Sequence, residues 1–391
     1  MLSDLDSLMR AGGIDTILVP MHEAMHPSFR WLSRGAKVTR GYAIKRVDAE
    51  PLLVAYPMER DEAAASGLTT RLVHEFDHAR IFREAANAID GYAEFFTRVL
   101  RDAGSGPRIA FFGNLPVQLY LGVAEAMARS GWDVVKGSGE DLIQLARKRK
   151  EEWEIEKIRD VGRRTELVVD AVRERLRAAT PELTLGDLKE LVSSEIARHG
   201  MIEDHETILS QGRDAGVPHS RGDASARVVP SVPIILDIFP ADKSSGYFFD
   251  LTRTFCIGAI PDALREIHGH VFEAFTRARN AMKPGTSAAS YQLMTCDYFE
   301  SHGFETTRRN PATLSGYVHS LGHGVGLDIH ERPSFAATPS NRDLIEEGDI
   351  VTIEPGLYFP ERAIGVRIED TFVVRAGGVE TLCRGSYELE P

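Results

Sequence analysis

Three histidines stand close together in the segment HSLGHGVGLDIHERP, residues 319–333. His319, His323 and His330 are separated by four and then by seven positions. Imidazole binds divalent transition metals and exchanges protons near neutral pH. The spacing therefore raises three interpretations: a metal site, a nucleotide-binding loop that contains histidines, or ordinary packing.

The residues around these histidines argue against two familiar motifs. Three glycines at 322, 324 and 326 disfavour a regular helix, and no glutamate follows His319, so the helical zinc motif is absent. The string GHGVG lacks the full G-x-G-x-x-G pattern of a dinucleotide loop. We expect the glycines to let the backbone pass close to a ligand or metal while a strand presents the histidines.

Acidic residues interrupt two apolar hairpins elsewhere in the chain. In residues 232–255, a turn centred between Lys243 and Ser244 places Asp237 directly opposite Asp250. Cross-strand partners lie roughly 5 Å apart, where two like charges are destabilising. Such a pair needs a proton on one carboxyl or a cation between the two.

The second hairpin repeats this arrangement in residues 348–374. A turn centred between Glu361 and Arg362 sets Glu354 opposite Glu369, and Arg367 shares a strand face with Glu369. Either pair alone could equally be partly exposed acids. Two hairpins of one pattern, with a histidine cluster between them, favour a metal site.

Four carboxylates and an imidazole form an oxygen-rich donor set. This set suits Mn(II) first, with Co(II), Fe(II) or Zn(II) also compatible, and it has enough ligands for two divalent ions. Two such ions would offset the negative charge, activate a water molecule and polarise a substrate carbonyl.

The elements that must position these residues form two predicted domains, 1–150 and 151–391. The first alternates strands (15–21, 51–57, 108–113) with a long amphipathic helix (75–104), an α/β pattern. The charged run 146–160 is expected to connect the two domains as a solvated helix face. In the second domain, residues 181–200 align without gaps with residues 284–303, and a long helix (152–179, 262–282) precedes each copy. This repeat predicts a duplicated helix-helix-strand unit with pseudo-two-fold symmetry.

The composition limits the partners and the compartment. A formal net charge of −12 argues against nucleic acid, and no apolar stretch reaches the ~20 residues of a membrane span. The acidic N-terminus is not a secretory signal, and three distant cysteines read as free thiols in a reducing compartment. We therefore expect a cytoplasmic protein.

Four motifs in order resemble those of the pita-bread metallopeptidases, the family of aminopeptidase P, prolidase and methionine aminopeptidase. They are LDIF…GYFFDLTRTF, HSLGHGVGLDIHE, VTIEPGLY and GVRIEDT, within residues 150–391. The N-terminal part resembles the creatinase-type domain of aminopeptidase P and prolidase. The resemblance implies a creatinase-like α/β N-terminal domain followed by an α+β pita-bread catalytic domain with duplicated halves.

The resemblance also implies roles for individual residues. The family's five metal ligands fall on Asp237, Asp250, His323, Glu354 and Glu369. Glu354 would also shuttle a proton. The remaining matches are substrate-side histidines, the third a looser match, and two residues that support Glu354: His319, His330, His219, Tyr358 and Arg367.

The implied activity is hydrolysis of the Xaa-Pro bond, in N-terminal segments of peptides or in dipeptides, by a hydroxide that bridges two metals. The substrates would be proline-containing peptides, and the protein would be a homo-oligomer, most simply a dimer. The alternatives are a related metallohydrolase acting on a non-peptide amide and a non-catalytic peptide-binding relative. The complete ligand set argues against a metal-free creatinase-like hydrolase, and the N-terminal domain argues against a simple methionine aminopeptidase.

Two departures from the family pattern stand out. The spacing between Asp237 and Asp250 is two residues longer than usual, which we expect to lengthen only the turn. Ser334 stands where some prolidases carry an arginine that holds the dipeptide carboxylate, and Arg332 lies two residues earlier. This difference favours longer Xaa-Pro peptides over dipeptides.

Overall fold

The computed structural model describes residues 1–22, 25–136 and 140–391. The chain divides into two compact units, Met1–Arg147 and Lys148–Pro391, so the boundary falls inside the charged run 146–160. Within the described ranges, no helix is both long enough and apolar enough to cross a membrane. The three cysteines are buried free thiols.

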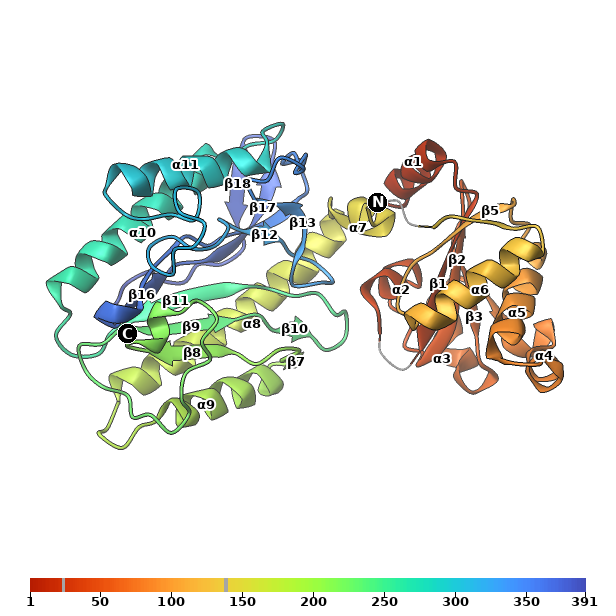
Figure 1. The fold of residues 1–391 in the computed structure, drawn as a ribbon. Coiled ribbons are helices and arrows are strands. Elements are labelled where there is room, and N and C mark those ends of the chain that lie inside the picture. The colour runs from red at the N-terminus through yellow and green to blue at the C-terminus, as the bar shows by residue number, and fades with distance from the viewer. Residues whose placement is uncertain (23–24, 137–139) are drawn as a thin grey trace. The chain divides into compact units, whose positions relative to one another are not determined.

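The N-terminal unit is built on one six-stranded sheet in the order β4-β3-β2-β1-β5-β6 (Figure 1). The pairs β1–β5, β5–β6 and β3–β4 are parallel, and β2 runs antiparallel to both β1 and β3. The strands are β1 (Thr16–His22), β2 (Arg40–Arg46), β3 (Leu52–Ala55), β4 (Thr69–Leu72), β5 (Arg108–Phe111) and β6 (Asp133–Val134). The helices are α1 (Leu2–Gly12), α2 (Pro27–Leu32), α3 (Arg60–Ala64), α4 (His78–Glu84), α5 (Ala88–Asp102), α6 (Val117–Arg129) and α7 (Leu142–Arg147), with short 3-10 turns η1 (Pro57–Glu59) and η2 (Val73–Phe76).

Helices cover both faces of this sheet. Leu18 of β1 packs in one apolar core with residues of α5 and α6, whereas its neighbours Ile17 and Val19 pack in a second core with residues of α1, α2 and α7. Successive strand residues point to opposite faces, so a strand that is apolar throughout needs cover on both sides. The predicted α/β architecture is therefore confirmed.

The expectation of one long helix over residues 75–104 is wrong. Asp77 adopts a left-handed backbone conformation (φ 58°) between η2 and α4. Asn87 then starts α5 as its N-cap, and its side chain accepts a hydrogen bond from the Asp90 N–H. Asn and Asp both favour these non-helical positions because their side chains bond to nearby backbone.

The C-terminal unit contains the predicted duplication. Helices α9 (Leu185–Arg198) and α11 (Ala288–Ser301) begin and end at corresponding positions of the two aligned segments. Each follows a longer helix, α8 (Glu152–Arg177) or α10 (Asp262–Ala281), against which it packs (Figure 1). The duplicated helix pairs are thus confirmed.

The strands of this unit form four small sheets, ordered β11-β9-β8, β13-β12-β14-β17-β18, β15-β16 and β10-β7. Their bounds are β7 (Met201–Ile202), β8 (Ile208–Gln211), β9 (Ile234–Ile238), β10 (Ala241–Asp242), β11 (Leu251–Phe255), β12 (His323–Gly324), β13 (Glu331–Ser334), β14 (Ile350–Ile353), β15 (Gly356–Phe359), β16 (Ile364–Arg367), β17 (Asp370–Arg375) and β18 (Gly378–Thr381), with 3-10 turns η3 (Asp214–Gly216) and η4 (Pro360–Arg362). The main core joins α10 and α11 to β14, β16 and β17.

The start of the charged run is buried rather than solvated. Lys148 is 5% exposed and Lys150 6% exposed. Lys148 Nζ lies 2.6 Å from Glu346 and 2.9 Å from Asp349, and Lys150 Nζ lies 3.4 Å from Glu331. The prediction of a solvated face fails here because acids of the same unit compensate these lysines, which makes their burial possible.

Candidate metal centre

The first acidic hairpin has a different register from the predicted one. Strands β9 and β11 place Asp237 opposite Thr252, not opposite Asp250. The turn closes one residue further along because Asp242 accepts hydrogen bonds from the backbone N–H groups of Ser244 and Ser245. Asp250 is then the diagonal neighbour of Asp237 across the hairpin, so both carboxylates still lie on one face.

The second hairpin has the predicted register. Ile353 pairs with Asp370, and Gly356 pairs with Arg367 on the other side of the acids. Because these pairs lie on either side of Glu354 and Glu369, the two glutamates are opposite each other. The expectation that these two acids face each other is confirmed.

The two hairpins meet edge to edge at Thr252 and Glu369. The Glu369 N–H donates to the Thr252 carbonyl at 3.1 Å, and the Thr252 hydroxyl donates to Glu369 Oε2 at 2.6 Å. Four residues thus form one row across four neighbouring strand segments, in the order Asp237, Thr252, Glu369 and Glu354. Sequence reasoning missed Thr252, although it follows Asp250 by two positions and therefore shares its face of the strand.

His323 lies on β12 and faces the acids. Its Nε2 is 3.5 Å from both Asp250 Oδ2 and Glu354 Oε1. Its Nδ1 lies 3.0 Å from the Gly324 carbonyl, which can only accept, so Nδ1 carries the proton and Nε2 offers its lone pair. Burial, and then the neighbouring His330, lower the pKa of His323 to about 3. The ring is therefore a neutral donor in the form a metal requires.

The glycines beside His323 lie close to the backbone of neighbouring strands. A Cβ on Gly322 would collide with the Thr352 carbonyl oxygen, and one on Gly324 with the Arg332 carbonyl oxygen. The expected close approach to a ligand or metal at these two positions stays a prediction. Their small size lets β12 lie tightly against adjacent backbone.

The hydrogen-bonding state of the acidic side chains is compatible with a bound cation. Among the acids of this site, three buried oxygens have no hydrogen-bond partner: Asp237 Oδ1, Asp250 Oδ1 and Glu369 Oε1. The second oxygens of Asp237 and Glu369 are held by Arg367 and Thr252. Asp250, His323 and Glu369 each offer a donor atom, and these atoms lie within 4.8 Å of one another. Buried carboxylate oxygens without partners are rare in proteins, and a divalent ion satisfies them.

The electrostatics of the acids lead to the same conclusion. Burial raises the pKa of Asp250 and of Glu369 well above the ordinary range, and the neighbouring carboxylates raise both further. Burial also raises the pKa of Glu354 to about 8, with Asp237 adding to it and Arg367 opposing it. A cation among these groups would remove the repulsion.

A hydrogen-bonded chain joins the acids to His319. Arg367 is buried, and its guanidinium donates to Asp237, to the Thr252 hydroxyl at 3.1 Å and to the Tyr358 hydroxyl at 2.9 Å. The Tyr358 hydroxyl lies 2.9 Å from His319 Nε2, and His319 Nδ1 lies 2.8 Å from the Ser320 carbonyl. Both ring nitrogens of His319 are thus engaged in protein hydrogen bonds.

The remaining histidines lie at the edge of this cluster. The rings of His323 and His330 are nearly perpendicular, with centroids 4.4 Å apart. His219 is exposed, and burial first and then the neighbouring His219 lower the pKa of His330. Its loop is tied to the site through the preceding Pro218, whose carbonyl accepts from Arg367 at 3.2 Å. The structure therefore gathers all the candidate residues in the C-terminal unit.

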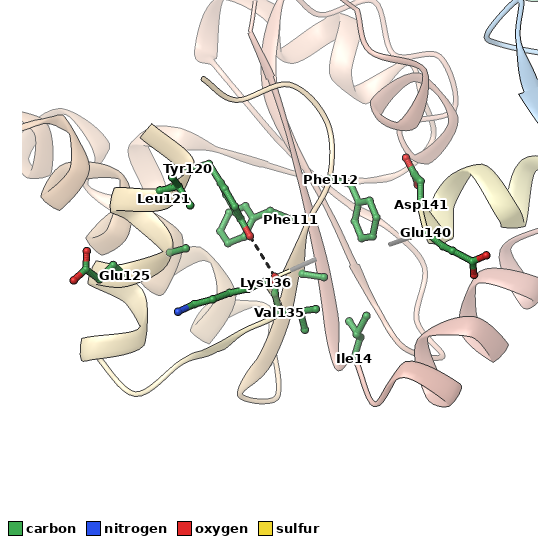
Figure 2. Close-up of a pocket in the computed structure, with 12 residues that line it drawn as sticks. Ile14, Phe111, Phe112, Tyr120, Leu121, Glu125, Val135, Lys136, Glu140 and Asp141 are labelled. Carbon is green, nitrogen blue, oxygen red and sulfur yellow. Dashed lines mark hydrogen bonds between the residues drawn. The ribbon is translucent and has the colours of Figure 1, made fainter. Parts of the chain in front are cut away.

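The N-terminal unit contains a cavity of about 770 Å³. Figure 2 shows its aromatic lining by Phe111, Phe112 and Tyr120, and the Tyr120 hydroxyl donates to the Val135 carbonyl at 3.3 Å. None of the candidate site residues lines this cavity.

Comparisons with known proteins show the family of this chain. Residues 156–376 match the model of metallopeptidase family M24. The chain is 32% identical over 258 residues to a Xaa-Pro dipeptidase of Pyrococcus furiosus, covering 64% of this chain and 67% of that protein. It is 31% identical over 254 residues to a Xaa-Pro dipeptidase of Lactobacillus delbrueckii subsp. lactis, covering 64% of each. The matched segment thus spans about two thirds of each relative.

Solved structures resemble the whole chain. A Xaa-Pro dipeptidase from Bacillus anthracis superposes with a TM-score of 0.80 at 24% identity, covering 99% of this chain and 98% of that one. An X-Pro aminopeptidase from Thermotoga maritima gives a TM-score of 0.77 at 22% identity, with 96% and 97% coverage. These similarities establish the pita-bread fold with its N-terminal domain. Since the family model covers more than half of the chain, the protein belongs to metallopeptidase family M24.

Proposed function

We propose that this protein is a di-metal Xaa-Pro peptidase. The observation that carries the proposal is the cluster of buried acids in which Asp237, Asp250 and Glu369 each have one oxygen without a hydrogen-bond partner, and in which Asp250 and Glu369 form a candidate metal site with His323. Relatives and structural neighbours named as Xaa-Pro dipeptidases or X-Pro aminopeptidases support the substrate class. The proposed ligands are Asp237, Asp250, His323, Glu354 and Glu369.

The bound ions would supply Lewis acidity, which polarises a carbonyl oxygen and activates water as a nucleophile. Glu354 handles the proton in our proposal. Its carboxyl is reached from two sides, by His323 at 3.5 Å and by His319 at 3.8 Å. A carboxyl beside the attacking water can take up its proton and release it to the leaving nitrogen.

The groups around the acids orient the substrate. Arg367 holds Asp237 and Tyr358 in place, and Tyr358 fixes the ring of His319. We assign His330 and His219 to the substrate side, where imidazole N–H groups can donate to the carbonyl oxygen as charge develops on it. A bond to proline nitrogen has no N–H, so the proline is recognised by shape.

Among Xaa-Pro substrates we propose a preference for peptides longer than two residues. Arg332 is the cation nearest in sequence to the position where some prolidases bind the dipeptide carboxylate. Its guanidinium pairs with Asp343, a buried carboxylate that also accepts from the Ser334 N–H at 2.7 Å. An arginine engaged in this way is poorly placed to receive a free substrate carboxylate.

The decisive experiment compares hydrolysis of Ala-Pro, Ala-Pro-Ala and the control Ala-Ala-Ala. Each is assayed with Mn(II), Co(II), Fe(II) or Zn(II) and after chelation. We expect cleavage of Ala-Pro-Ala above Ala-Pro, no cleavage of the control, highest activity with Mn(II), and loss on chelation. Absence of activity on every Xaa-Pro peptide, with metal demonstrably bound, would overturn the substrate assignment and leave the metal site standing.

The assembly and compartment belong to the same proposal. We propose a cytoplasmic homodimer, which sedimentation of the purified protein and fractionation of its source cells can check. Three buried thiols support a reducing compartment.

A further inference from the structure

The last ten residues of the chain lie against the strands that carry the acids. The Cys256 N–H at the end of β11 donates to the Leu389 carbonyl at 2.8 Å. Arg173 of α8 donates to the Ser386 carbonyl at 3.2 Å, and His268 of α10 lies 2.9 Å from the Tyr387 carbonyl. The C-terminal segment, residues 382–391, is thus anchored to three elements of the unit.

One side chain of this segment reaches the residue next to a proposed metal ligand. The Tyr387 hydroxyl donates to Asp370 Oδ2, and Arg253 donates to Asp370 Oδ1 at 2.8 Å. The guanidinium of Arg253 also lies over the Tyr387 ring, 4.6 Å from its centroid. Asp370 and Arg253 are 0% and 2% exposed, so this network is screened from solvent.

The same arginine holds the junction of the two hairpins. Its Nη1 donates to the Thr252 carbonyl at 2.9 Å and to the Glu369 carbonyl at 2.7 Å, and its Nε donates to the Ser386 carbonyl at 2.9 Å. Successive residues of a strand point to opposite faces. The Glu369 side chain therefore points toward the acids. The Asp370 side chain points to the opposite face, where Arg253 and Tyr387 bind it.

We propose that Tyr387, acting through Asp370 and Arg253, is a positioning residue for Glu369. The inference rests on the proposed function, in which Glu369 is a metal ligand. Tyr387 does not touch the acids. Its hydroxyl fixes the Asp370 carboxylate, which fixes the backbone at Glu369 and so the direction of the Glu369 carboxylate. Partners of this kind tune metal affinity as well as ligand orientation.

The test is Tyr387→Phe, which removes the hydroxyl and keeps the ring over Arg253. The control is Tyr291→Phe in the same unit, since the Tyr291 hydroxyl is hydrogen-bonded as well: it accepts from the Lys283 N–H and donates to the Ala281 carbonyl. Mn(II) binding to metal-stripped full-length protein is measured by calorimetry, alongside kcat and KM on Ala-Pro-Ala. We expect Tyr387→Phe to bind Mn(II) about tenfold more weakly and to lose kcat at saturating metal with KM little changed. The control should match the wild type in both.

The outcomes separate this inference from the proposed function. Wild-type binding by Tyr387→Phe, or an equal loss in Tyr291→Phe, overturns the positioning role. Glu369→Gln is titrated in parallel, and normal Mn(II) binding by that variant would instead overturn the ligand assignment. If Tyr387→Phe melts below the assay temperature, Asp370→Asn, which keeps the side-chain volume, takes its place with the same expected loss of Mn(II) affinity.

Discussion

Thr252 and Glu369 join the two halves of the C-terminal unit. Their main chains exchange hydrogen bonds of 3.4 and 3.1 Å, and the Thr252 hydroxyl donates to Glu369 Oε2 at 2.6 Å. The same hydroxyl accepts from Arg367 Nε at 3.1 Å, and Thr252 pairs with Asp237 across β9 and β11. The Thr252 side chain therefore links Glu369 to Arg367, which in turn binds Asp237 of the other hairpin.

Replacement of this hydroxyl gives the first prediction. Thr252→Val keeps the shape but leaves a buried carboxylate oxygen and a guanidinium N–H without their partner. We expect the free energy of unfolding to fall by about 1–3 kcal/mol. Thr276→Val is the control, because the Thr276 hydroxyl is buried without a hydrogen-bond partner, and this change should be neutral or stabilising. Urea denaturation of the two variants measures the difference, and equal destabilisation would contradict the role of Thr252.

Removal of one acid should have opposite effects with and without metal. Asp250 is 4% exposed and is repelled by Asp237 and Glu354. Asp250→Asn relieves this repulsion, so the metal-free variant should melt at a higher temperature than the metal-free wild type. Mn(II) should raise the melting temperature of the wild type, since it binds only the folded state, and should raise that of the variant little or not at all. Thermal melts with and without Mn(II) test this prediction. The control is Glu182→Gln on the surface. If Asp250→Asn responds to Mn(II) as the wild type does, Asp250 is excluded as a ligand.

A pair of helical glycines offers a packing test. In α8, a Cβ at Gly162 would lie 2.6 Å from Phe249 Cε2, whereas at Gly269 in α10 nothing lies within 4 Å. Gly269→Ala should stabilise the protein by about 0.5–1 kcal/mol, because alanine favours helix. Gly162→Ala should instead destabilise it by about 1–2 kcal/mol through overpacking. Because Phe249 precedes Asp250, we also expect weaker Mn(II) binding in Gly162→Ala; stabilisation by both changes would mean that Phe249 moves aside freely.

A buried acid away from the site predicts a pH dependence. Burial raises the pKa of Asp349 to about 6 from 3.8, with Lys148 opposing the rise, and its neighbours are Lys148 and Glu346. Between these two pKa values the folded state holds a proton that the unfolded state has released. The contribution of Asp349 to stability therefore falls as pH rises from about 4 to 6 and is constant above.

The comparison of the wild type with Asp349→Asn isolates this contribution. The difference in unfolding free energy, wild type minus variant, should decrease across that pH window and then level off. A difference that stays constant, or that increases with pH, would show that Asp349 titrates normally.

Residue type and local spacing predicted much of this protein. The matching positions of α9 and α11 follow from a repeat in polar caps and apolar positions, because helix ends depend on nearby residues. The register that sets Glu354 against Glu369 follows from a turn whose centre can be read from the sequence. The donor set itself required only residue identities.

Other features depended on contacts that local patterns do not contain. The register of the first hairpin differs from the predicted one because the Asp242 side chain accepts hydrogen bonds from two backbone N–H groups. The burial of Lys148 depended on Glu346 and Asp349, which lie about 200 residues away in the chain. A charged residue is predicted to be exposed unless the group that compensates its charge is known.

The sequence by itself thus determined which side chains could bind metal and which strands would carry them. Only the tertiary structure decided that Thr252 and Glu369 pair across the two halves, and that the Tyr387 hydroxyl donates a hydrogen bond to Asp370. The physical reason is that hairpins and helices form from near neighbours in the chain. The meeting of two hairpins, and the docking of a terminal segment on them, are chosen by packing and charge compensation over the whole unit.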